Sequence, residues 1–433
     1  MIYKMLLQDE SGIVSEYLYN VYTNTITDQF GKLLIENNTN MKFETVIPIS
    51  PDRPGKKGKI KTLKIQLGLK CNYSCSYCLQ SVEIADGTVS NNTDANKFLK
   101  DLSCWIHEPP QRIEFWGGEP FVYWSKLKLL VTELRSIFPY AEFLIITNGS
   151  LLDSEKVQFI IDNDINIGIS HDGPQQKFRG PDPFNNESLF NTIKRLIESR
   201  PRKVSFNSVI HSKNYDLNEI YDFFNEKFPN PNLSLEGIVA IYDDYTLKNI
   251  GQFTKKQYLE LTDNIFYELI VHKNRFGNLT RKMRSFINSL KTQTPIESIS
   301  QKCGMDREDM IAVDLLGNVM TCQNTGAKGK HKIGTVYDYE NIKLDTSTHL
   351  SFREECMHCP VVQLCKGSCM YLYDDYFTQT CWNEYYYNMG ILKAALFVLT
   401  GKILIHIEGD IRRPEYSVSS LEKNSKLKDL YEV

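Results

Sequence analysis

The sequence predicts an α/β fold in which six parallel strands and their helices form a partial barrel. Three observations indicate it. Between residues 61 and 239, short apolar stretches alternate with longer helix-like stretches. The apolar stretches end in turn residues such as Gly, Asn and Asp. The alternation then stops, and cysteines gather after residue 300. Repeated β/α units give a parallel sheet with helices outside it and right-handed crossovers.

The alternation gives each expected element in order. The strands are expected at Leu63–Gly68, Arg112–Trp116, Glu142–Thr147, Asn166–Ser170, Lys203–Ile210 and Leu233–Val239. The helices between them are expected at Ala95–His107, Tyr123–Ile137, Ser154–Asn163, Leu189–Ser199 and Leu217–Lys227. Eight units are not visible, so we expect a partial (β/α)6 TIM-like barrel with its site at the carboxyl ends of the strands.

The length of 433 residues predicts two or three domains. Ser50–Ile60 contains two prolines, two glycines and four basic residues, which is typical of a linker. Before it, Glu16–Tyr22 and Lys32–Glu36 have the composition of short strands. Residues 252–290 have a helical pattern. The expected units are a small N-terminal unit at 1–58, the barrel at 59–290, a cysteine-rich domain at 300–385, and a C-terminal helix and tail at 386–433.

The composition is that of a globular chain and argues against two classes of protein. Hydrophobic residues make up 42% and charged residues 24%, and the net charge of −3 does not favour a nucleic-acid or membrane-surface role. The N-terminus lacks the apolar core of a secretion signal. Two lysines interrupt the apolar run Ile391–Ile405, which is too short to span a bilayer. We expect a cytoplasmic protein whose 11 cysteines are reduced and free to bind metal.

Three cysteines follow the first expected strand with the spacing C-x3-C-x2-C. They are Cys71, Cys75 and Cys78. A cubane iron–sulfur cluster normally takes four thiolates, so three thiolates from one loop leave one iron open to another ligand. A structural zinc site is the alternative. Zinc needs a fourth Cys or His close by, however, and the next cysteine is Cys104.

Polar residues follow the next three strands at the same expected rim. After the second strand come Gly117, Gly118 and Glu119. Glycines let a backbone approach a ligand closely, and a carboxylate can pair with an ammonium group. The residues that follow the third and fourth strands are Asn148, Ser170 and Arg179. Each of these residues, taken singly, is a common residue of turns. Together they suit a zwitterionic amino-acid ligand that is attached to something larger.

These motifs resemble the radical S-adenosylmethionine (SAM) enzymes. Their C-x3-C-x2-C signature is matched at Cys71, Cys75 and Cys78, and a GGEP-like motif is matched at Gly117–Pro120. The resemblance implies that the three cysteines are the catalytic centre and hold a [4Fe–4S] cluster. The methionyl amine and carboxylate of SAM would chelate its fourth iron. Cleavage of SAM would give a 5′-deoxyadenosyl radical that removes hydrogen from an unactivated carbon.

The same resemblance implies contacts to SAM along the rim. Glu119 and the Gly117–Gly118 backbone would hold the amine. The other implied contacts are Ser170 and Arg179 to the carboxylate and ribose, Asn148 nearby, and Val209 at the adenine pocket. The cofactor carries the hard chemistry, and the protein orients and shields it.

Seven further cysteines form a second set. They are Cys303, Cys322, Cys356, Cys359, Cys365, Cys369 and Cys381. Thiolates this dense bind metal, and two zinc sites are one interpretation. The spacing also resembles the SPASM extension of radical SAM enzymes, which binds two auxiliary [4Fe–4S] clusters. By that resemblance a distal cluster is held by Cys356, Cys359, Cys365 and Cys381, and a proximal one by Cys303, Cys322 and Cys369, which makes three clusters in all.

The resemblance narrows the function to the modification of peptides or proteins. In the sulfatase-maturing branch an Asp follows the G-x4-C cysteine and acts as a base. Here Gln323 follows Cys322, and a neutral amide cannot take that proton. We therefore expect a maturase that installs an oxidative C–C cyclophane or thioether cross-link in a ribosomally synthesised precursor peptide (RiPP). The alternatives are a peptide epimerase, an anaerobic sulfatase-type maturase and, outside the enzymes, an iron–sulfur electron carrier.

The expected partners follow from this function. They are a precursor peptide with a leader and an external low-potential electron donor of the flavodoxin or ferredoxin type, with no nucleic acid and no membrane. Many peptide maturases bind the leader as an added edge strand. Residues 1–58 would be either a reduced version of such a leader-binding unit or a cap on the barrel.

Overall fold

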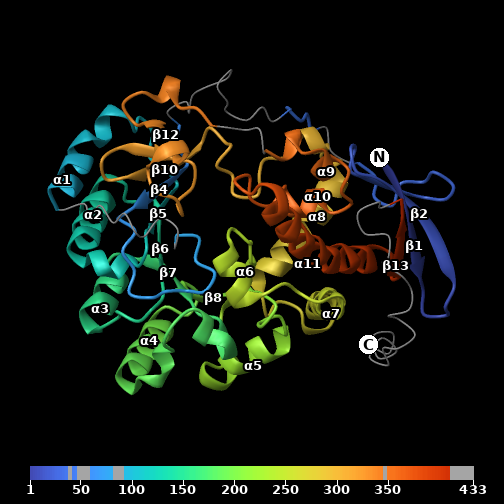
Figure 1. Ribbon diagram of the computed structural model, residues 1–433, viewed down its shortest axis with the longest axis horizontal. Coiled ribbons are helices and arrows are strands. Elements are labelled where there is room, and N and C mark those ends of the chain that lie inside the picture. Colours follow the sequence, from blue (N-terminus) through green and yellow to red (C-terminus); the bar gives the residue numbers. More distant parts are fainter. Residues whose placement is uncertain (38–40, 46–58, 81–91, 345–348, 410–433) are drawn as a thin grey trace. The chain divides into compact units, whose positions relative to one another are not determined.

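The computed structural model describes residues 1–37, 41–45, 59–80, 92–344 and 349–409 (Figure 1). The chain divides into two compact units. The barrel unit comprises residues 48–252 and 303–346, and the cysteine-rich unit comprises residues 1–47, 253–302 and 347–433. Most of the expected linker Ser50–Ile60 lies outside the described residues. The bounds of the four domains expected from the sequence stay predictions.

The barrel unit is built on one nine-stranded sheet with the order β12-β11-β10-β4-β5-β6-β7-β8-β9. The strands β10 and β4 to β9 run parallel, whereas β11 and β12 are antiparallel. The bounds are β4 Thr62–Gln66, β5 Arg112–Trp116, β6 Glu142–Thr147, β7 Ile165–Ser170, β8 Val204–Ile210, β9 Leu233–Ile238, β10 Met310–Asp314, β11 Asn318–Met320 and β12 Lys332–Thr335. The six predicted strands are confirmed, and the order ends at two unpaired edges within the described residues, so the barrel is partial.

Helices connect the strands of the barrel unit and lie outside its sheet (Figure 1). Their bounds are α1 Asn92–Asp101, α2 Trp124–Ile137, α3 Ser154–Asp162, α4 Glu187–Ser199, α5 Leu217–Lys227 and α6 Asp244–Ile250. The side chains of Asp153, Asn186 and Asp216 accept hydrogen bonds from first-turn N–H groups of α3, α4 and α5. These caps satisfy donors that have no partner within the helix. The predicted helix Ala95–His107 is too long, because α1 ends at Asp101 and a 3-10 turn follows.

Side chains of the barrel sheet alternate between two faces. Phe143 faces the helices, since the Arg135 guanidinium of α2 lies 3.8 Å from the centre of its ring. The opposite, inner face of β4 and β5 is polar. Its residues, paired across the strands, are Lys64 with Glu114 and Gln66 with Trp116. Three of these four side chains are buried, so this polar face is enclosed rather than solvated.

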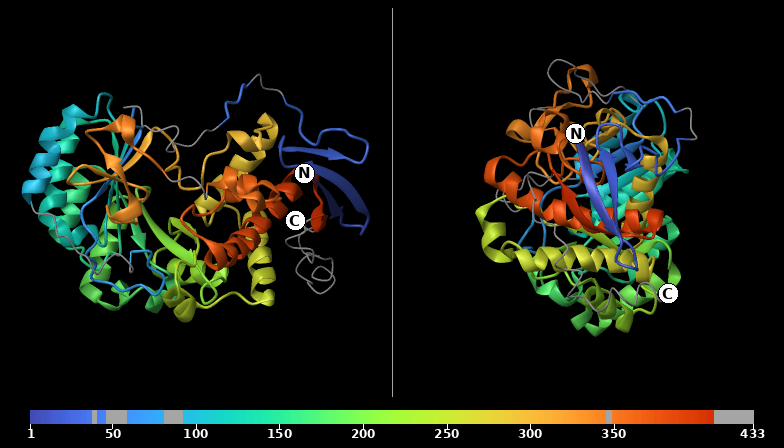
Figure 2. Two further views of the ribbon diagram at one scale, coloured as in Figure 1. Left: turned by 45° about the horizontal axis from the view of Figure 1, so that its top comes forward. Right: turned by 90° about the vertical axis from the view of Figure 1, so that its right-hand side faces the viewer.

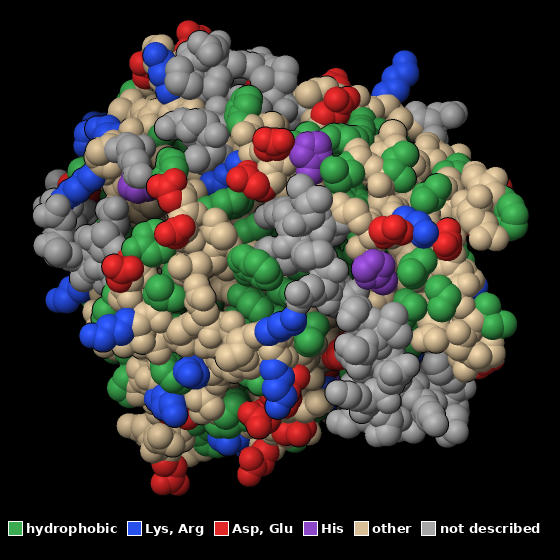
Figure 3. All heavy atoms as spheres, turned by 45° about the vertical axis from the view of Figure 1, so that its right-hand side comes forward, with side chains coloured by type: hydrophobic (Ala, Val, Ile, Leu, Met, Phe, Trp, Pro, Cys, Tyr) green, Lys and Arg blue, Asp and Glu red, His purple; other side chains and the backbone are tan. Residues whose placement is uncertain are grey.

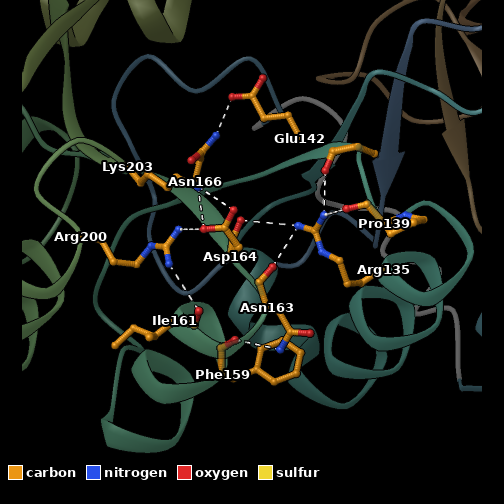
Figure 4. A network of polar contacts seen from close by, with 11 residues as sticks. Arg135, Pro139, Glu142, Phe159, Ile161, Asn163, Asp164, Asn166, Arg200 and Lys203 are labelled. Carbon is orange, nitrogen blue, oxygen red and sulfur yellow. Dashed lines mark hydrogen bonds and ion pairs between the residues drawn. The ribbon is translucent and has the colours of Figure 1, made fainter.

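A network of polar contacts fixes the amino edge of the barrel sheet (Figure 4). Arg135 donates to the carbonyl oxygens of Ala141 at 2.8 Å and Asn163 at 2.9 Å. Asp164 accepts from the Lys203 ammonium at 2.6 Å. These contacts tie the end of α2 and the loop after α3 to the start of β6 and β7. They lie at the edge opposite the carboxyl ends of the strands, where contacts serve stability.

The cysteine-rich unit contains an antiparallel sheet with the order β13-β1-β2-β3. The bounds are β1 Ile2–Gln8, β2 Val14–Asn20, β3 Thr25–Asp28 and β13 Ile403–Glu408. Its helices are α7 Lys255–Tyr267, α8 Gly277–Thr292, α9 Glu354–Met357, α10 Val362–Cys365 and α11 Asp374–Thr400. The helical pattern predicted at 252–290 is confirmed. Figure 2 shows β13 beside β1, although Lys4 and Glu408, which pair, are far apart in the sequence.

Two local expectations in this unit are wrong. The segment Lys32–Glu36 is not a strand, because only Leu33 makes an isolated bridge, to Thr27. The C-terminal segment is not only a helix and tail, because β13 follows α11. The break between them is Gly401, whose φ of +69° ends the helix in a left-handed cap. The helix α11 also continues across the boundary expected at residue 385.

The surface agrees with the small net charge. On the face shown in Figure 3, acidic and basic side chains lie interspersed. Among the described residues no helix combines the length and the apolar character that crossing a membrane requires.

We predict that Arg135→Ala lowers the free energy of unfolding by about 2 kcal/mol, because several carbonyl oxygens lose a charged donor and the stem loses its packing on Phe143. Urea unfolding followed by circular dichroism measures this. Arg202→Ala, which removes an exposed arginine, is the control and should change stability little. Equal losses in both variants would contradict the role given to the network.

Candidate active site

The three-cysteine loop begins at the carboxyl end of β4 and docks against the loop after β5. The Gly118 N–H donates to the Gly68 carbonyl oxygen, and the Glu119 N–H donates to that of Lys70, both at 3.0 Å. On the other side, the Ser76 N–H donates to the Phe178 carbonyl oxygen at 2.7 Å. The loop is therefore held between the ends of β5 and β7, on the rim where the sequence predicted it.

Gly117 and Gly118 make this docking possible. A Cβ atom at Gly117, whose φ is +152°, would lie 2.4 Å from the Gly68 carbonyl oxygen. A Cβ at Gly118 would lie 2.3 Å from the Lys70 carbonyl oxygen. No side chain fits at either position without moving the cysteine loop. The Gly118 N–H is already used by this loop, so the expected contact of the glycine backbone with the SAM amine stays a prediction.

The three thiols of the loop share one environment. Cys71, Cys75 and Cys78 form no disulfide and are half-buried. Burial raises the pKa of Cys75 to about 12, although the Arg179 charge lowers it, and the other two thiols raise it further. The Tyr73 N–H points at the Cys71 sulfur at 3.4 Å. Thiolates in this place need a cation to offset them, which fits a metal cluster.

The number of thiols in the loop bears on the kind of metal site. A zinc site takes four ligands, and the loop supplies three. A cubane can bind three thiolates from one loop, each on a different iron. The donor set of the loop therefore fits a [4Fe–4S] cluster, with one iron left for another ligand.

Glu119 is buried at the rim beside the cysteine loop. Its Oε1 accepts from the Thr147 hydroxyl at 2.7 Å and the Phe121 N–H at 3.0 Å, and its Oε2 accepts from the Asn148 N–H at 2.7 Å. Burial raises the pKa of Glu119 to about 7, and these donors counteract the rise. Oε2 has one donor and can accept another, so the carboxylate can receive an N–H group of a ligand.

Asn148 supports the cysteine loop from the end of β6. Its Nδ2 donates to the Asn72 Oδ1 at 2.9 Å, and its Oδ1 accepts from the N–H of Ser150 at 2.9 Å and from its hydroxyl. Asn72 also donates to the Ser150 hydroxyl at 2.8 Å. These contacts bring Asn148 next to the first turn of the loop. Its proximity to SAM stays a prediction.

Asp172 joins the predicted rim residues to the cysteine loop, and the sequence did not single it out. Its Oδ1 accepts from the Arg179 guanidinium at 3.1 Å and from the Val209 N–H at 3.0 Å, and its Oδ2 accepts from the Tyr77 hydroxyl. Asp172 is fully buried. The tyrosine lies between Cys75 and Cys78, so the carboxylate ties the ends of β7 and β8 to the cluster loop. Ser170 is buried at the end of β7.

Buried donors without a partner surround this carboxylate. Within the described residues, the Arg179 Nε, the Gln176 Nε2 and the His211 Nε2 have no hydrogen-bond partner. The ring of His211 lies 5.5 Å from that of Tyr77. Because the His211 Nδ1 accepts from the Lys213 N–H at 3.2 Å, the Nε2 carries the proton of the neutral ring. Buried donors of this kind call for acceptors, and the oxygen and nitrogen atoms of SAM would supply them.

His211 was also missed by sequence reasoning. Its position directly after the predicted fifth strand is the signal that could have found it, since the other rim residues follow strands in the same way. Burial lowers the pKa of His211 to about 4, so it is neutral near pH 7. By contrast His171 is packed, stacked 4.3 Å from Phe184 and hydrogen-bonded to Asp182 at 3.0 Å.

The polar inner face below the rim meets the segment after β11. The Gln66 amide donates to the carbonyl oxygens of Gln323 at 3.1 Å and Thr325 at 2.7 Å. The Lys64 ammonium donates to the Gln323 Oε1 at 3.3 Å and lies 3.8 Å from Glu114. The residue after Cys322 is thus fixed against β4, with its amide oxygen toward a buried cation.

Of the distal cysteines, Cys356 and Cys365 lie on the short helices α9 and α10, Cys359 lies between these helices, and Cys381 lies on α11. Cys356 and Cys359 are buried, and Cys365 and Cys381 are half-buried. Burial raises the pKa of Cys365, and the charges of Glu384, Cys356 and Cys381 raise it further. A buried thiol of this kind ionises readily only with a cation beside it, and four thiols are a donor set that fits a cluster.

The chain between Cys365 and Cys369 has an unusual backbone. Lys366, Gly367 and Ser368 all have positive φ values, of 53°, 73° and 53°. The Gln301 amide holds this turn by donating to the carbonyl oxygens of Gly367 at 3.2 Å and Ser368 at 2.9 Å. One buried side chain thus sets the path between two cysteines.

The N-terminal sheet holds the first pair of distal cysteines. The hydroxyl of Tyr3 in β1 donates to the His358 carbonyl oxygen, and the hydroxyl of Tyr22 lies 3.1 Å from the His358 Nδ1. His358 stands between Cys356 and Cys359. Tyr3 and Tyr22 therefore support the turn that carries these two cysteines, and whether residues 1–58 bind a leader stays a prediction.

The proximal set divides between the two units. Cys303 and Cys322 belong to the barrel unit, and Cys369 belongs to the cysteine-rich unit. The Asn324 N–H points at the Cys322 sulfur at 3.4 Å. The grouping of these three cysteines around one cluster stays a prediction. The apolar, helix-like stretch around Cys104 predicts a core position for this cysteine, but Cys104 lies in the 3-10 turn after α1 and is exposed.

Comparisons with known proteins agree with this geometry. Residues 65–224 match the radical SAM superfamily. The chain is 22% identical to the radical SAM cyclopropyl synthase TigE of Paramaledivibacter caminithermalis, over 72% of this chain and 68% of that one. It is 25% identical to a cysteine-type anaerobic sulfatase-maturating enzyme of Clostridium perfringens, over 69% and 85%. The solved structure of anSMEcpe with bound AdoMet has a TM-score of 0.57 at 21% identity, covering 78% of this chain and 98% of that one, which shows a shared fold.

We predict that Gly118→Ala destabilises the docked cysteine loop by about 1–3 kcal/mol and lowers the iron content of anaerobically purified protein. The added methyl group would overlap two carbonyl oxygens of the loop. Gly277→Ala is the matched control, because a Cβ there meets no atom within 4 Å. Iron assays and urea unfolding measure both effects. Full iron content in the Gly118 variant would contradict the docking argument.

We predict that Glu119→Gln weakens SAM binding by about 10- to 100-fold, because the ligand loses a charged acceptor. Equilibrium dialysis of SAM against iron-loaded protein measures it. Glu187→Gln, on the exposed first turn of α4, is the control and should bind SAM normally. Unchanged affinity in the Glu119 variant would remove this residue from the SAM site.

Proposed function

Residues 65–224 form the radical SAM domain of a radical SAM enzyme, and on this premise we propose that the chain is a peptide maturase. Its substrate is a side chain of a ribosomally synthesised precursor peptide, from which hydrogen is abstracted. The product is an oxidative cross-link of the C–C cyclophane or thioether type. The family implies SAM and one [4Fe–4S] cluster; the two auxiliary clusters belong to the proposal.

The residues of the barrel rim have different roles in the reaction. When bound, the cluster and SAM supply a 5′-deoxyadenosyl radical that takes a hydrogen atom from the substrate. Cys71, Cys75 and Cys78 hold the cluster. Glu119 accepts from the amine, and Arg179, fixed by Asp172, meets the carboxylate or the ribose. The buried donors around Asp172 that have no partner in the structure would donate hydrogen bonds to acceptor atoms of SAM. These side chains bind and orient the cofactor and keep water from it.

Peptides or proteins are the proposed class of substrate. The relatives are named for cyclopropyl synthesis and for sulfatase maturation, and anSMEcpe is solved with a bound Cp18Cys peptide. The polar inner face below the rim, with Lys64 and Glu114, is able to contact peptide groups. The leader of the precursor would bind elsewhere on the chain, with residues 1–58 as one candidate.

One contact, between Gln323 and Lys64, favours cross-linking over sulfatase maturation as the function. The residue after Cys322 is an amide, and its oxygen accepts from the buried ammonium at 3.3 Å. An amide cannot take a proton from a substrate. Even a carboxylate in this place would pair with Lys64, which would lower its pKa and weaken it as a base. The site is thus not built around a base at this position.

Cross-linking removes two electrons from the peptide, and the second leaves after hydrogen abstraction. The distal set, which fits a cluster, and the proximal set together offer a sink for that electron. An external donor of the flavodoxin or ferredoxin type would reduce the SAM-binding cluster. Epimerisation needs no such sink, which makes it the weaker alternative.

Sulfatase maturation remains the second candidate, because the sulfatase-maturating relative is matched over 85% of its length at 25% identity. A sulfatase maturase of this kind would convert a sulfatase-derived peptide in vitro. The two candidates thus differ in substrate, and the same loaded protein can be offered both.

We predict that a short open reading frame near the gene of this chain encodes the precursor peptide, and that co-expression of the two gives a peptide that has lost two hydrogen atoms per event. Mass spectrometry detects it. A variant with Cys71, Cys75 and Cys78 changed to Ala is the control and should leave the peptide unmodified. An unchanged mass with deuterium uptake would indicate an epimerase, and conversion of a sulfatase peptide alone would indicate the second candidate. Fully loaded protein should contain roughly twelve irons per chain if three cubanes are present.

A further inference from the structure

Charged side chains of opposite sign stand at the distal cysteine set. The Lys302 ammonium pairs with the Glu384 carboxylate. The Lys302 N–H also donates to the Lys366 carbonyl oxygen at 2.9 Å, which fixes its backbone beside the turn after Cys365. Glu384, on α11, is 2% exposed, and its Oε2 accepts from the Asn388 amide at 3.0 Å. The acid is therefore held in place one turn after Cys381.

Further cations stand around the same cysteines. Arg353 is 7% exposed, donates to the Cys369 carbonyl oxygen at 3.2 Å and lies 3.8 Å from the centre of the Phe377 ring. The Lys282 ammonium lies 5.1 Å from the centre of the Tyr387 ring. Among the described residues, charged groups near the set include the cations Lys282, Lys302, Lys366 and Arg353 and the acids Glu355 and Glu384. In this group the cations outnumber the acids.

One thiol responds to both members of the ion pair. Burial raises the pKa of Cys365, and the Glu384 charge raises it further, whereas the Lys302 charge lowers it. Glu384 is buried, so water screens its charge only weakly, whereas 35% of the Lys302 side chain is exposed and water screens the Lys302 charge more. Any anion bound at Cys365 will feel the same two charges.

A cluster at this set would be such an anion. Four thiolates on a [4Fe–4S]2+ core carry a total charge of −2, and uptake of one electron makes it −3. A cation nearby stabilises the reduced form more than the oxidised form, and an anion does the reverse. The surroundings therefore bear directly on the reduction potential.

We propose that the charges of Lys302 and Glu384 act in opposite directions on the reduction potential of one cluster and together set it. That cluster is the one held by Cys356, Cys359, Cys365 and Cys381. The inference rests on the proposed cluster assignment. Lys302 raises the potential and Glu384 lowers it, and the excess of cations favours the reduced state. The distal cluster is thereby suited to accept the electron that leaves the substrate.

The test is a redox titration of the full-length, iron-loaded protein with dithionite as the reductant, followed by electron paramagnetic resonance. Cys71, Cys75 and Cys78 are changed to Ala in every sample, so that only auxiliary signals remain. The distal signal is the one that Cys365→Ala removes. Lys302→Gln should shift its midpoint to a more negative potential, and Glu384→Gln should shift it to a more positive one. Lys302→Arg keeps the charge and should keep the midpoint.

Lys291→Gln is the matched control, since it removes an exposed lysine from α8 in the same unit. It should leave the midpoint unchanged. Shifts of the same sign in the Lys302→Gln and Glu384→Gln variants would mean that packing, not charge, sets the potential, and would overturn the inference, as would no shift. If Glu384→Gln does not fold, the midpoint potentials of Lys302→Gln and Lys302→Arg decide whether charge sets the potential. If Cys365→Ala removes no signal and no iron, the cluster assignment itself fails, which is a different result.

Discussion

The site depends on one constraint: two loops must approach each other at the carboxyl edge of β4 and β5 more closely than any side chain allows. Gly117 and Gly118 meet the segment before the cysteines with Cβ positions that would lie 2.4 and 2.3 Å from carbonyl oxygens. Two backbone hydrogen bonds then fix the start of the cysteine loop, and the same turn buries Glu119. Asp172 closes the arrangement from the other side through Tyr77. Cluster ligands, acid and cation are thus held by backbone and buried contacts rather than by flexible side chains.

Sequence reasoning reached the features that depend on local pattern. The six parallel strands follow from apolar stretches at regular intervals, and the three-cysteine loop follows from spacing and from its place after the first strand. What it missed depends on tertiary partners. Asp172 has the residue type and the position of an ordinary turn residue, and its partners Tyr77 and Val209 are remote in the sequence. His211 directly follows the fifth predicted strand, but its proximity to Tyr77 depends on the tertiary fold. The strand β13 was hidden because its apolar residues continue the apolar run of α11, and only Gly401 marks the change.

The two units use different means to hold their cysteines. In the barrel unit, strand ends bring the loop and the rim residues together, which is the usual advantage of a parallel sheet. In the cysteine-rich unit the helices that carry Cys356 and Cys365 have only four residues each. Side chains from remote segments, Gln301 and Tyr3 among them, hold the turns there instead. Similar thiols are thus placed by a regular sheet in one unit and by single long-range hydrogen bonds in the other.

The pairing of β1 with β13 has a consequence for biosynthesis. At about 5–20 residues per second, a ribosome needs roughly 20 to 80 seconds to travel from the first strand to its partner, since Lys4 pairs with Glu408. Throughout that time the sheet that braces the His358 turn lacks its edge strand β13. The turn therefore gains its full support only after the whole of α11 has been synthesised.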